Sequence, residues 1–243
     1  MREYGLIGFP LSHSFSQRYF TEKFSRENIN DTVFLNFSIP KIEDVAVIFS
    51  DHPQLKGLAV TIPYKKSVIK YLDETDEVVK EISACNCVKI DAHAKTGYNT
   101  DVIGFERSFA KNLKPHHTKG LVLGTGGAAS AVKFVLQKIG IEYLVVSRTA
   151  SEKTISYNDI TSEMLSEHPV IINCTPLGTY PNIQDAPPLP YRFLNASHYL
   201  FDLVYNPLVT KFLQYGKNVN CTIQNGYEML VIQAEENWKI WNS

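Results

Sequence analysis

The 243-residue sequence contains no apolar run of about 18 residues, the length that a transmembrane helix requires. Its first residues form a strand pattern instead of a signal peptide. It also has no block of lysines and arginines, and its formal net charge is -1, so neither nucleic acid nor an anionic membrane surface is expected as a partner. These absences predict a cytoplasmic protein whose partner is a small molecule.

Cysteine is scarce as well. The four cysteines form no C-x-x-C pair, so the sequence predicts neither a disulfide framework nor a metal site. No nucleophilic triad, Walker lysine, internal repeat or low-complexity segment is present. The remaining composition, 44% hydrophobic and 20% charged, is typical of a globular protein with one or two domains.

A complete β-turn-α-β pattern spans residues 119–149. An apolar run at 121–123 predicts a buried strand, and G-T-G-G-A-A at 124–129 fits the G-x-G-x-x-G/A turn that precedes a helix. In this pattern Gly124 turns the chain, Gly126 admits a pyrophosphate and Ala129 packs the helix on the sheet. A glycine-rich turn without a ligand would look the same, but the flanking elements favour a Rossmann unit. The cofactor-binding residues predicted in the turn are Gly124, Gly126, Gly127 and Ala128.

The end of the second strand indicates which dinucleotide is bound. An NAD site usually has an acidic residue there, whereas this chain has Ser147, Arg148 and Thr149. A guanidinium pairs with a 2′-phosphate and a hydroxyl adds a hydrogen bond. We therefore predict NADP(H) as the cofactor, with an ordinary surface arginine as the alternative reading of Arg148.

Candidate substrate residues precede this unit. Ser14 and Ser16 surround the start of a helix predicted at 16–26, where they either cap the helix or bind an anion such as a substrate carboxylate. Thr61 and Lys65 follow a strand predicted at 55–62, at the edge where α/β sheets bind ligands. Asn86, in a strand predicted at 84–90, is either structural or a partner of substrate hydroxyls.

A polar linker at 114–117 precedes the nucleotide unit, and the domain boundary is predicted inside or just before the helix at 102–112. The two histidines of the linker, His116 and His117, are predicted to be solvent-exposed. Strands and helices alternate on both sides of the linker, and residues 226–241 form a long amphipathic helix. The predicted fold class is therefore α/β, with a Rossmann unit after the linker.

Together these segments resemble the shikimate dehydrogenase family over nearly the whole chain. The resemblance rests on G-F-P-L-S-H-S-F-S at 8–16, V-T-I-P-Y-K at 60–65, N-T-D-V-I-G-F at 99–105, L-G-T-G-G-A-A at 123–129, S-R-T at 147–149, I-N-C-T-P-L-G at 172–178, D-L-V-Y-N-P at 202–207 and M-L-V-I-Q-A at 229–234. It implies a substrate-binding catalytic domain at 1–102, a Rossmann NADP-binding domain at 103–225, and a C-terminal helix at 226–243 that packs on the substrate domain.

The resemblance also implies roles for individual residues. Lys65 and Asp101 match the catalytic pair, which would act on the reacting oxygen. The implied substrate-binding residues are Ser14 and Ser16 for the carboxylate, Thr61, Asn86 and Gln233 for the ring hydroxyls, and Tyr205. Thr175 and Gly226 join the cofactor-binding set. Three residues depart from the family pattern: Ala59 where asparagine is usual, Cys87 where threonine is usual, and Glu152 where a basic residue is frequent.

The implied activity is the reversible, NADPH-dependent reduction of 3-dehydroshikimate to shikimate, in chorismate and aromatic amino-acid biosynthesis, by a monomer or homodimer. Three alternatives remain open at this point. The chain is a quinate/shikimate dehydrogenase that uses NAD or either cofactor, another two-domain dehydrogenase, or a non-catalytic NADP-binding regulatory homologue.

Overall fold

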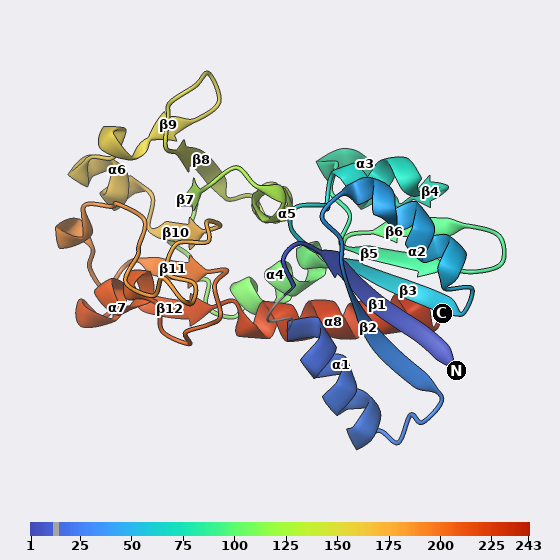
Figure 1. The fold of residues 1–243 in the computed structure, drawn as a ribbon. Helices are drawn as coiled ribbons and strands as arrows, with labels where there is room; N and C mark the ends of the chain where they lie inside the picture. Colours follow the sequence, from blue (N-terminus) through green and yellow to red (C-terminus); the bar gives the residue numbers. More distant parts are fainter. Residues whose placement is uncertain (12–14) are drawn as a thin grey trace. The chain divides into compact units, whose positions relative to one another are not determined.

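The structure, a computed structural model, describes residues 1–11 and 15–243. The chain divides into two compact units, unit 1 with Met1–Thr100 and Gln233–Ser243, and unit 2 with Asp101–Ile232. Each unit contains one six-stranded sheet (Figure 1). The predicted α/β fold class is therefore confirmed. Helix α8 (Tyr227–Trp241) belongs to unit 2 up to Ile232 and to unit 1 from Gln233 onward.

Unit 1 has a mixed sheet in the order β2-β1-β3-β5-β6-β4. Its strands are β1 (Arg2–Gly8), β2 (Thr32–Ser38), β3 (Leu55–Val60), β4 (Glu74–Thr75), β5 (Cys87–Ile90) and β6 (Lys95–Tyr98). Strand β1 runs parallel to β2 and β3, and β5 runs antiparallel to β3 and β6. The helices of the first hundred residues are α1 (Phe15–Arg26), α2 (Val45–Asp51) and α3 (Glu77–Ile82), with short 3-10 turns η1 (Ile42–Asp44) and η2 (Ser67–Tyr71).

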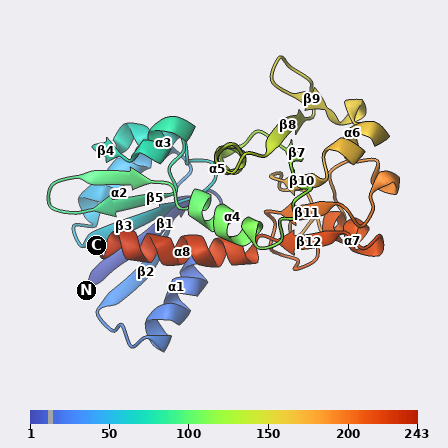
Figure 2. The same cartoon turned by 180° about the vertical axis from the view of Figure 1, so that it is seen from behind.

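The two faces of this sheet bury two separate apolar clusters, because side chains alternate along each strand. Leu58 and Val60 face the cluster that includes residues of α2 and α3. Ala59, between them, faces the cluster that includes residues of α1 and α8. Figures 1 and 2 show α8 running along the sheet on the same side as α1.

A glycine lets the end of α8 lie close to the sheet. A Cβ built at Gly57 in β3 would lie 2.3 Å from Cγ of Trp241, so any larger residue would displace the indole. The Trp241 ring also stacks on Tyr4 of β1, with 5.3 Å between the ring centroids. Trp241 is thus an apolar anchor of α8 in unit 1.

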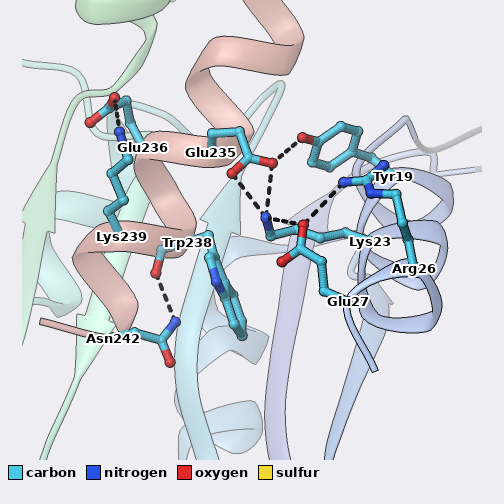
Figure 3. Close-up of polar contacts among 9 residues, drawn as sticks. All are labelled: Tyr19, Lys23, Arg26, Glu27, Glu235, Glu236, Trp238, Lys239 and Asn242. Atoms are coloured by element: carbon cyan, nitrogen blue, oxygen red, sulfur yellow. Dashed lines mark hydrogen bonds and ion pairs between the residues drawn. The ribbon is translucent and has the colours of Figure 1, made fainter. Parts of the chain in front are cut away.

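A buried lysine ties α8 to α1 (Figure 3). Lys23 is only 4% exposed, and its Nζ lies 2.9 Å from Oε2 of Glu235 and 2.9 Å from Oε1 of Glu27. Tyr19 donates a further hydrogen bond to Glu235, and burial together with that carboxylate raises the pKa of Tyr19. The ammonium is stabilised by two carboxylates, as a buried charge requires.

Unit 2 has an all-parallel sheet in the order β12-β11-β10-β7-β8-β9. Its strands are β7 (Lys119–Leu123), β8 (Glu142–Ser147), β9 (Ile155–Ser156), β10 (Val170–Asn173), β11 (Tyr199–Asp202) and β12 (Thr222–Asn225). The helices that complete it are α4 (Asp101–Ala110), α5 (Gly127–Lys138), α6 (Ser162–Glu167) and α7 (Lys211–Asn218), with 3-10 turns η3 (Tyr157–Asp159) and η4 (Tyr191–Phe193). The strand order reverses between β7 and β10, which is the switch point where such sheets bind ligands.

Several local predictions were wrong. His117 is 3% exposed, because its ring packs on Tyr199 and its Nε2 lies 3.2 Å from the carbonyl oxygen of Ser197; burial lowers its pKa. Asn86 lies just before β5 instead of within a strand, and the short strands β4 and β9 were not predicted.

Across the described ranges, no helix is both long and apolar enough to cross a membrane.

Candidate active site

Four buried polar side chains of unit 1 meet beside the start of β5. Asn86 Nδ2 lies 3.0 Å from Thr100 Oγ1 and 3.4 Å from Gln233 Oε1. Thr100 Oγ1 donates to Asn237 Oδ1 at 2.6 Å, and Asn237 Nδ2 lies 3.4 Å from Gln233 Oε1. We call these four residues the amide ring. The structure thus brings together Asn86 and Gln233, two predicted substrate residues, and adds Thr100 and Asn237.

Sequence reasoning did not single out Thr100 or Asn237. Thr100 lies inside the quoted N-T-D-V-I-G-F segment, but a threonine beside an aspartate reads first as a helix cap. Asn237 lies one helical turn after Gln233 in α8, and that i, i+4 spacing of two amides on a buried face was the available signal.

Hydrogen bonds anchor Asn99 and Thr100, the two residues before Asp101. The backbone N–H of Thr100 donates to Asn86 Oδ1 at 2.7 Å, and Asn99 Nδ2 donates to the carbonyl oxygen of Ala84 at 2.8 Å. Asp101 follows directly as the first residue of α4 and is buried. Its backbone is therefore fixed through its immediate neighbour in the chain.

Thr61 and Lys65 lie on a turn that follows β3. The N–H of Thr61 donates to the carbonyl oxygen of Ile7, and the carbonyl oxygen of Lys65 accepts from the N–H of Cys85 at 2.7 Å. Between them Tyr64 is buried, and its hydroxyl donates to the carbonyl oxygen of Ile39 at 2.5 Å. The half-buried Lys65 side chain thus extends from a backbone that is anchored at several points.

The predicted serine pair is described only in part. Ser14 lies outside the described residues, and Ser16 is half-buried in the first turn of α1. Tyr205, also predicted to face the substrate, lies in unit 2, and burial raises the pKa of its phenol.

Two departures from the family pattern are neighbours. Ala59 of β3 and Cys87 of β5 are directly opposite in the antiparallel pair, and both belong to the apolar cluster that includes Trp241. Burial raises the pKa of the Cys87 thiol, so it remains a neutral thiol. An apolar pair therefore occupies the place of two polar residues.

In unit 2 the glycine turn joins the end of β7 to the start of α5. Gly124 has φ +107°, a conformation that favours glycine. Gly126 is the N-cap of α5, and a Cβ built on it meets no atom of the described residues within 4 Å. Ala129 is fully buried against the sheet. Packing inside the protein does not require glycine at 126, whereas a phosphate approaching the free N–H groups of the helix start does.

Ser147 ends β8, and Arg148 and Thr149 are exposed just beyond it. The chain then folds back, since Ser151 and Thr154 exchange backbone hydrogen bonds of 2.9 and 3.3 Å, and Thr154 Oγ1 lies 3.2 Å from Ser147 Oγ. Glu152 and Lys153 are therefore the central residues of a tight turn. Both are exposed in this turn, which the Thr154 side chain links to Ser147.

A second buried polar network follows β10. Thr175 Oγ1 donates to Asn173 Oδ1 at 2.6 Å, and Asn173 Nδ2 donates to Asp202 Oδ1 at 2.9 Å. Thr210 and the N–H of Val204 also donate to the Asp202 carboxylate. Desolvation exceeds the effect of these donors and raises the pKa of Asp202 to about 7. Thr175 is thus held at the carboxyl edge of the sheet, where Gly124 also lies.

Gly226 has a structural reason to be glycine. A Cβ there would lie 2.2 Å from the carbonyl oxygen of Leu203, because the backbone before α8 passes close to the end of β11. Its predicted contact with the cofactor stays a prediction.

A parallel sheet in the order of unit 2, with a glycine turn at its switch point, is the arrangement of a dinucleotide-binding Rossmann domain. Residues 6–88 match the shikimate dehydrogenase substrate binding domain. The chain is 37% identical to the shikimate dehydrogenase (NADP(+)) of Clostridium beijerinckii, over 99% of this chain and 92% of that protein.

Two solved structures agree with this match. The first is the chorismate mutase/shikimate 5-dehydrogenase fusion of Clostridium acetobutylicum, with 35% identity, a TM-score of 0.88, and coverage of 100% of this chain and 91% of that chain. The second is the Thermus thermophilus shikimate 5-dehydrogenase in complex with NADP(H) and shikimate, with 26% identity, a TM-score of 0.87, and coverage of 99% and 93%. The chain belongs to the shikimate dehydrogenase family, which confirms the resemblance found in the sequence.

Proposed function

We propose that this chain catalyses the reversible, NADP-dependent interconversion of 3-dehydroshikimate and shikimate. The proposal rests on the match to NADP-dependent shikimate dehydrogenases over nearly the full length of both chains. The glycine turn of unit 2 and the polar residues of unit 1 fit a dinucleotide and a polyhydroxylated substrate, respectively.

In this proposal unit 1 binds the substrate. Ser14 and Ser16 bind its carboxylate, Thr61 binds its hydroxyls together with Asn86 and Gln233 of the amide ring, and Tyr205 of unit 2 completes the set. The anchored turn of Lys65 and the fixed segment before Asp101 support roles for these two residues, because catalytic groups need a rigid backbone.

When bound, NADPH supplies a hydride, so the ketone oxygen must receive a proton. We assign the proton transfer to the Lys65 ammonium and the orientation of that ammonium and of the reacting oxygen to the Asp101 carboxylate. The residues assigned to NADP are Gly124, Gly126, Gly127, Ala128, Ser147, Arg148, Thr149, Thr175 and Gly226.

A single assay tests the reaction. NADPH absorbance is followed with 3-dehydroshikimate, and NADP and NAD are then compared with shikimate and with quinate as substrates. Turnover of shikimate with NADP is the expected result. Binding of NADPH without turnover would instead favour a regulatory homologue.

The cofactor preference is testable by substitution. Arg148→Ala should remove most of the preference for NADP over NAD, because one charge-assisted contact contributes on the order of 1.5 to 3 kcal/mol. Glu152→Arg should increase the preference, because it replaces a negative charge in the turn attached to Ser147. The measurement is kcat/KM for both cofactors, with Arg18→Ala, an exposed arginine of α1, as the control.

The same exposed Glu152 favours one second candidate, an enzyme of the family that uses NAD as well as NADP. Equal kcat/KM for the two cofactors in the wild type would overturn the NADP assignment and support that candidate.

A further inference from the structure

The amide ring is closed, and each member is buried. Two of its residues, Asn86 and Gln233, are assigned to the substrate in the proposed function, whereas Asn237 has no role there. Asn237 contacts both Thr100 and Gln233.

The orientation of every amide in the ring follows from one backbone group. The N–H of Thr100 can only donate, so the Asn86 atom 2.7 Å away is its oxygen Oδ1. Asn86 therefore turns its Nδ2 toward Thr100 Oγ1 and toward Gln233. The Gln233 atom that faces Asn86 must be an acceptor, which is Oε1.

The remaining bonds are consistent with this assignment. Because Gln233 presents Oε1, the Asn237 atom facing it is the donor Nδ2. Asn237 Oδ1 then faces Thr100, whose hydroxyl donates to it at 2.6 Å. Reversing any one amide would place two donors or two acceptors against each other, so the ring has a single favourable arrangement.

The ring determines the orientation of the Gln233 amide. Two donors, Asn86 Nδ2 and Asn237 Nδ2, contact its Oε1, so the atom that the ring holds is Oε1 and the other end of the amide is the donor Nε2. Two residues further along α8, Glu235 forms an ion pair with Lys23 of α1 (Figure 3), which ties this part of the helix to α1. Gln233 is thus prepared to donate a hydrogen bond to an oxygen atom.

We propose that Asn237 is a positioning residue that holds Gln233 as a hydrogen-bond donor to a hydroxyl oxygen of the substrate. The proposal rests on the proposed function, because that function assigns Gln233 to the substrate. Asn237 acts through Gln233 and does not itself touch the substrate. Without the second donor, Gln233 has less reason to keep Oε1 inward.

Two substitutions at the same site test this role. Asn237→Asp keeps the shape and the acceptor for Thr100 but turns a second acceptor toward Gln233 Oε1. Asn237→Leu keeps the approximate volume and removes both contacts. Each should raise the KM for shikimate by about tenfold or more, while the KM for NADP stays within about twofold of the wild type. Each variant combined with Gln233→Ala should add little to the effect of Gln233→Ala alone.

Matched variants separate positioning from stability. Thr100→Ser keeps the hydroxyl of the ring and should retain the wild-type KM for shikimate, whereas Thr100→Val should raise it. Val45→Ala creates a cavity in the cluster on the other face of the sheet, so it should lower the melting temperature and leave both KM values unchanged. If the Asn237 variants lower the melting temperature but leave the KM for shikimate unchanged, the positioning role is wrong.

Titration calorimetry measures the binding of shikimate without turnover, so it tests the role of Asn237 separately from the proposed reaction. A wild type that binds shikimate without turnover contradicts the reaction alone, and the dissociation constants of the same variants then decide the role of Asn237. A wild type that binds no shikimate overturns both.

Discussion

Lys65 and Lys66 are adjacent lysines whose side chains differ in burial. The Lys65 side chain is half-buried, and the Lys65 carbonyl oxygen accepts a hydrogen bond from the N–H of Cys85, whereas the Lys66 side chain is exposed. Lys65 therefore combines a partly buried side chain with an anchored backbone, as expected of a group that must meet a reacting oxygen, whereas the side chain of Lys66 extends into solvent. The pair therefore provides a test with an internal control.

Lys65→Ala should lower kcat by about two to four orders of magnitude, the usual contribution of a general acid or base. The KM for NADPH should change little, because the substitution is made in unit 1. Lys66→Ala should leave kcat near the wild-type value. Steady-state kinetics with 3-dehydroshikimate measures both, and near-normal turnover of Lys65→Ala would exclude the proposed mechanism.

Gly126 and Gly226 lack a side chain for different reasons. At Gly126 a Cβ meets no described atom within 4 Å, whereas at Gly226 it would lie 2.2 Å from the Leu203 carbonyl oxygen. Gly126→Ala should therefore weaken NADPH binding by about tenfold or more and change the free energy of unfolding by less than about 1 kcal/mol. Gly226→Ala should lower that free energy by about 1 to 3 kcal/mol. Urea unfolding and NADPH titration measure the two effects, and a reversed pattern would contradict the assignment of Gly126 to the pyrophosphate.

At the scale of the element, the paired strands β3 and β5 carry Ala59 and Cys87 where the family pattern has asparagine and threonine. Ala59 and Cys87 are opposite each other and buried. Ala59→Asn alone should lower the free energy of unfolding by about 1 to 3 kcal/mol, because it buries an amide in an apolar cluster. Adding Cys87→Thr should recover part of the loss, since the threonine hydroxyl lies across from the new amide.

A double-mutant cycle on urea unfolding measures the coupling of these two positions. The matched single variant Cys87→Ser introduces a hydroxyl without the new amide and serves as the control. Strictly additive effects of Ala59→Asn and Cys87→Thr would show that the two departures from the family pattern are independent.

The strand β11 ends in a carboxylate that opposes folding at high pH. Burial raises the pKa of Asp202 from 3.8 to about 7, so the folded state binds this proton more tightly than the unfolded chain. The contribution to stability is therefore complete below about pH 4 and is lost as pH rises through about 7. At pH 8 the ionised carboxylate lowers the free energy of unfolding, by about 1.4 kcal/mol for each unit of pKa difference.

Asp202→Asn should reduce this loss, because an amide keeps the bonds from Asn173 and Val204 and can donate to the Thr210 hydroxyl. The expected gain at pH 8 is on the order of 1 to 3 kcal/mol in the free energy of unfolding, and the gain should disappear near pH 4. Asp159→Asn is a control of opposite sign, because hydrogen bonds from Ser156 lower the pKa of Asp159. Urea unfolding from pH 4 to pH 8 tests both, and an equal change of Asp202→Asn at all pH values would be evidence against the raised pKa.

At the scale of the whole molecule, the sequence predicted the parts whose signals are local. The turn at Gly124 and Gly126 needs only neighbouring residues to be recognised, and the α/β class follows from alternating apolar segments. The amide ring could not be predicted in the same way, because Asn86, Thr100 and Asn237 are far apart in the sequence. The burial of His117 was not predicted for the same reason, because it depends on contacts with the distant residues Tyr199 and Ser197.

The shared helix α8 has a consequence for synthesis. Residues Gln233–Ser243 complete unit 1, and they supply both Gln233 and Asn237 to the ring and Trp241 to the space above Gly57. A ribosome makes these residues after every residue of unit 2, although domains generally fold as they emerge. The apolar cluster that Trp241 shares with β1 and α1 therefore cannot be completed until α8 has left the exit tunnel, so unit 1 keeps apolar surface exposed while unit 2 is being synthesised.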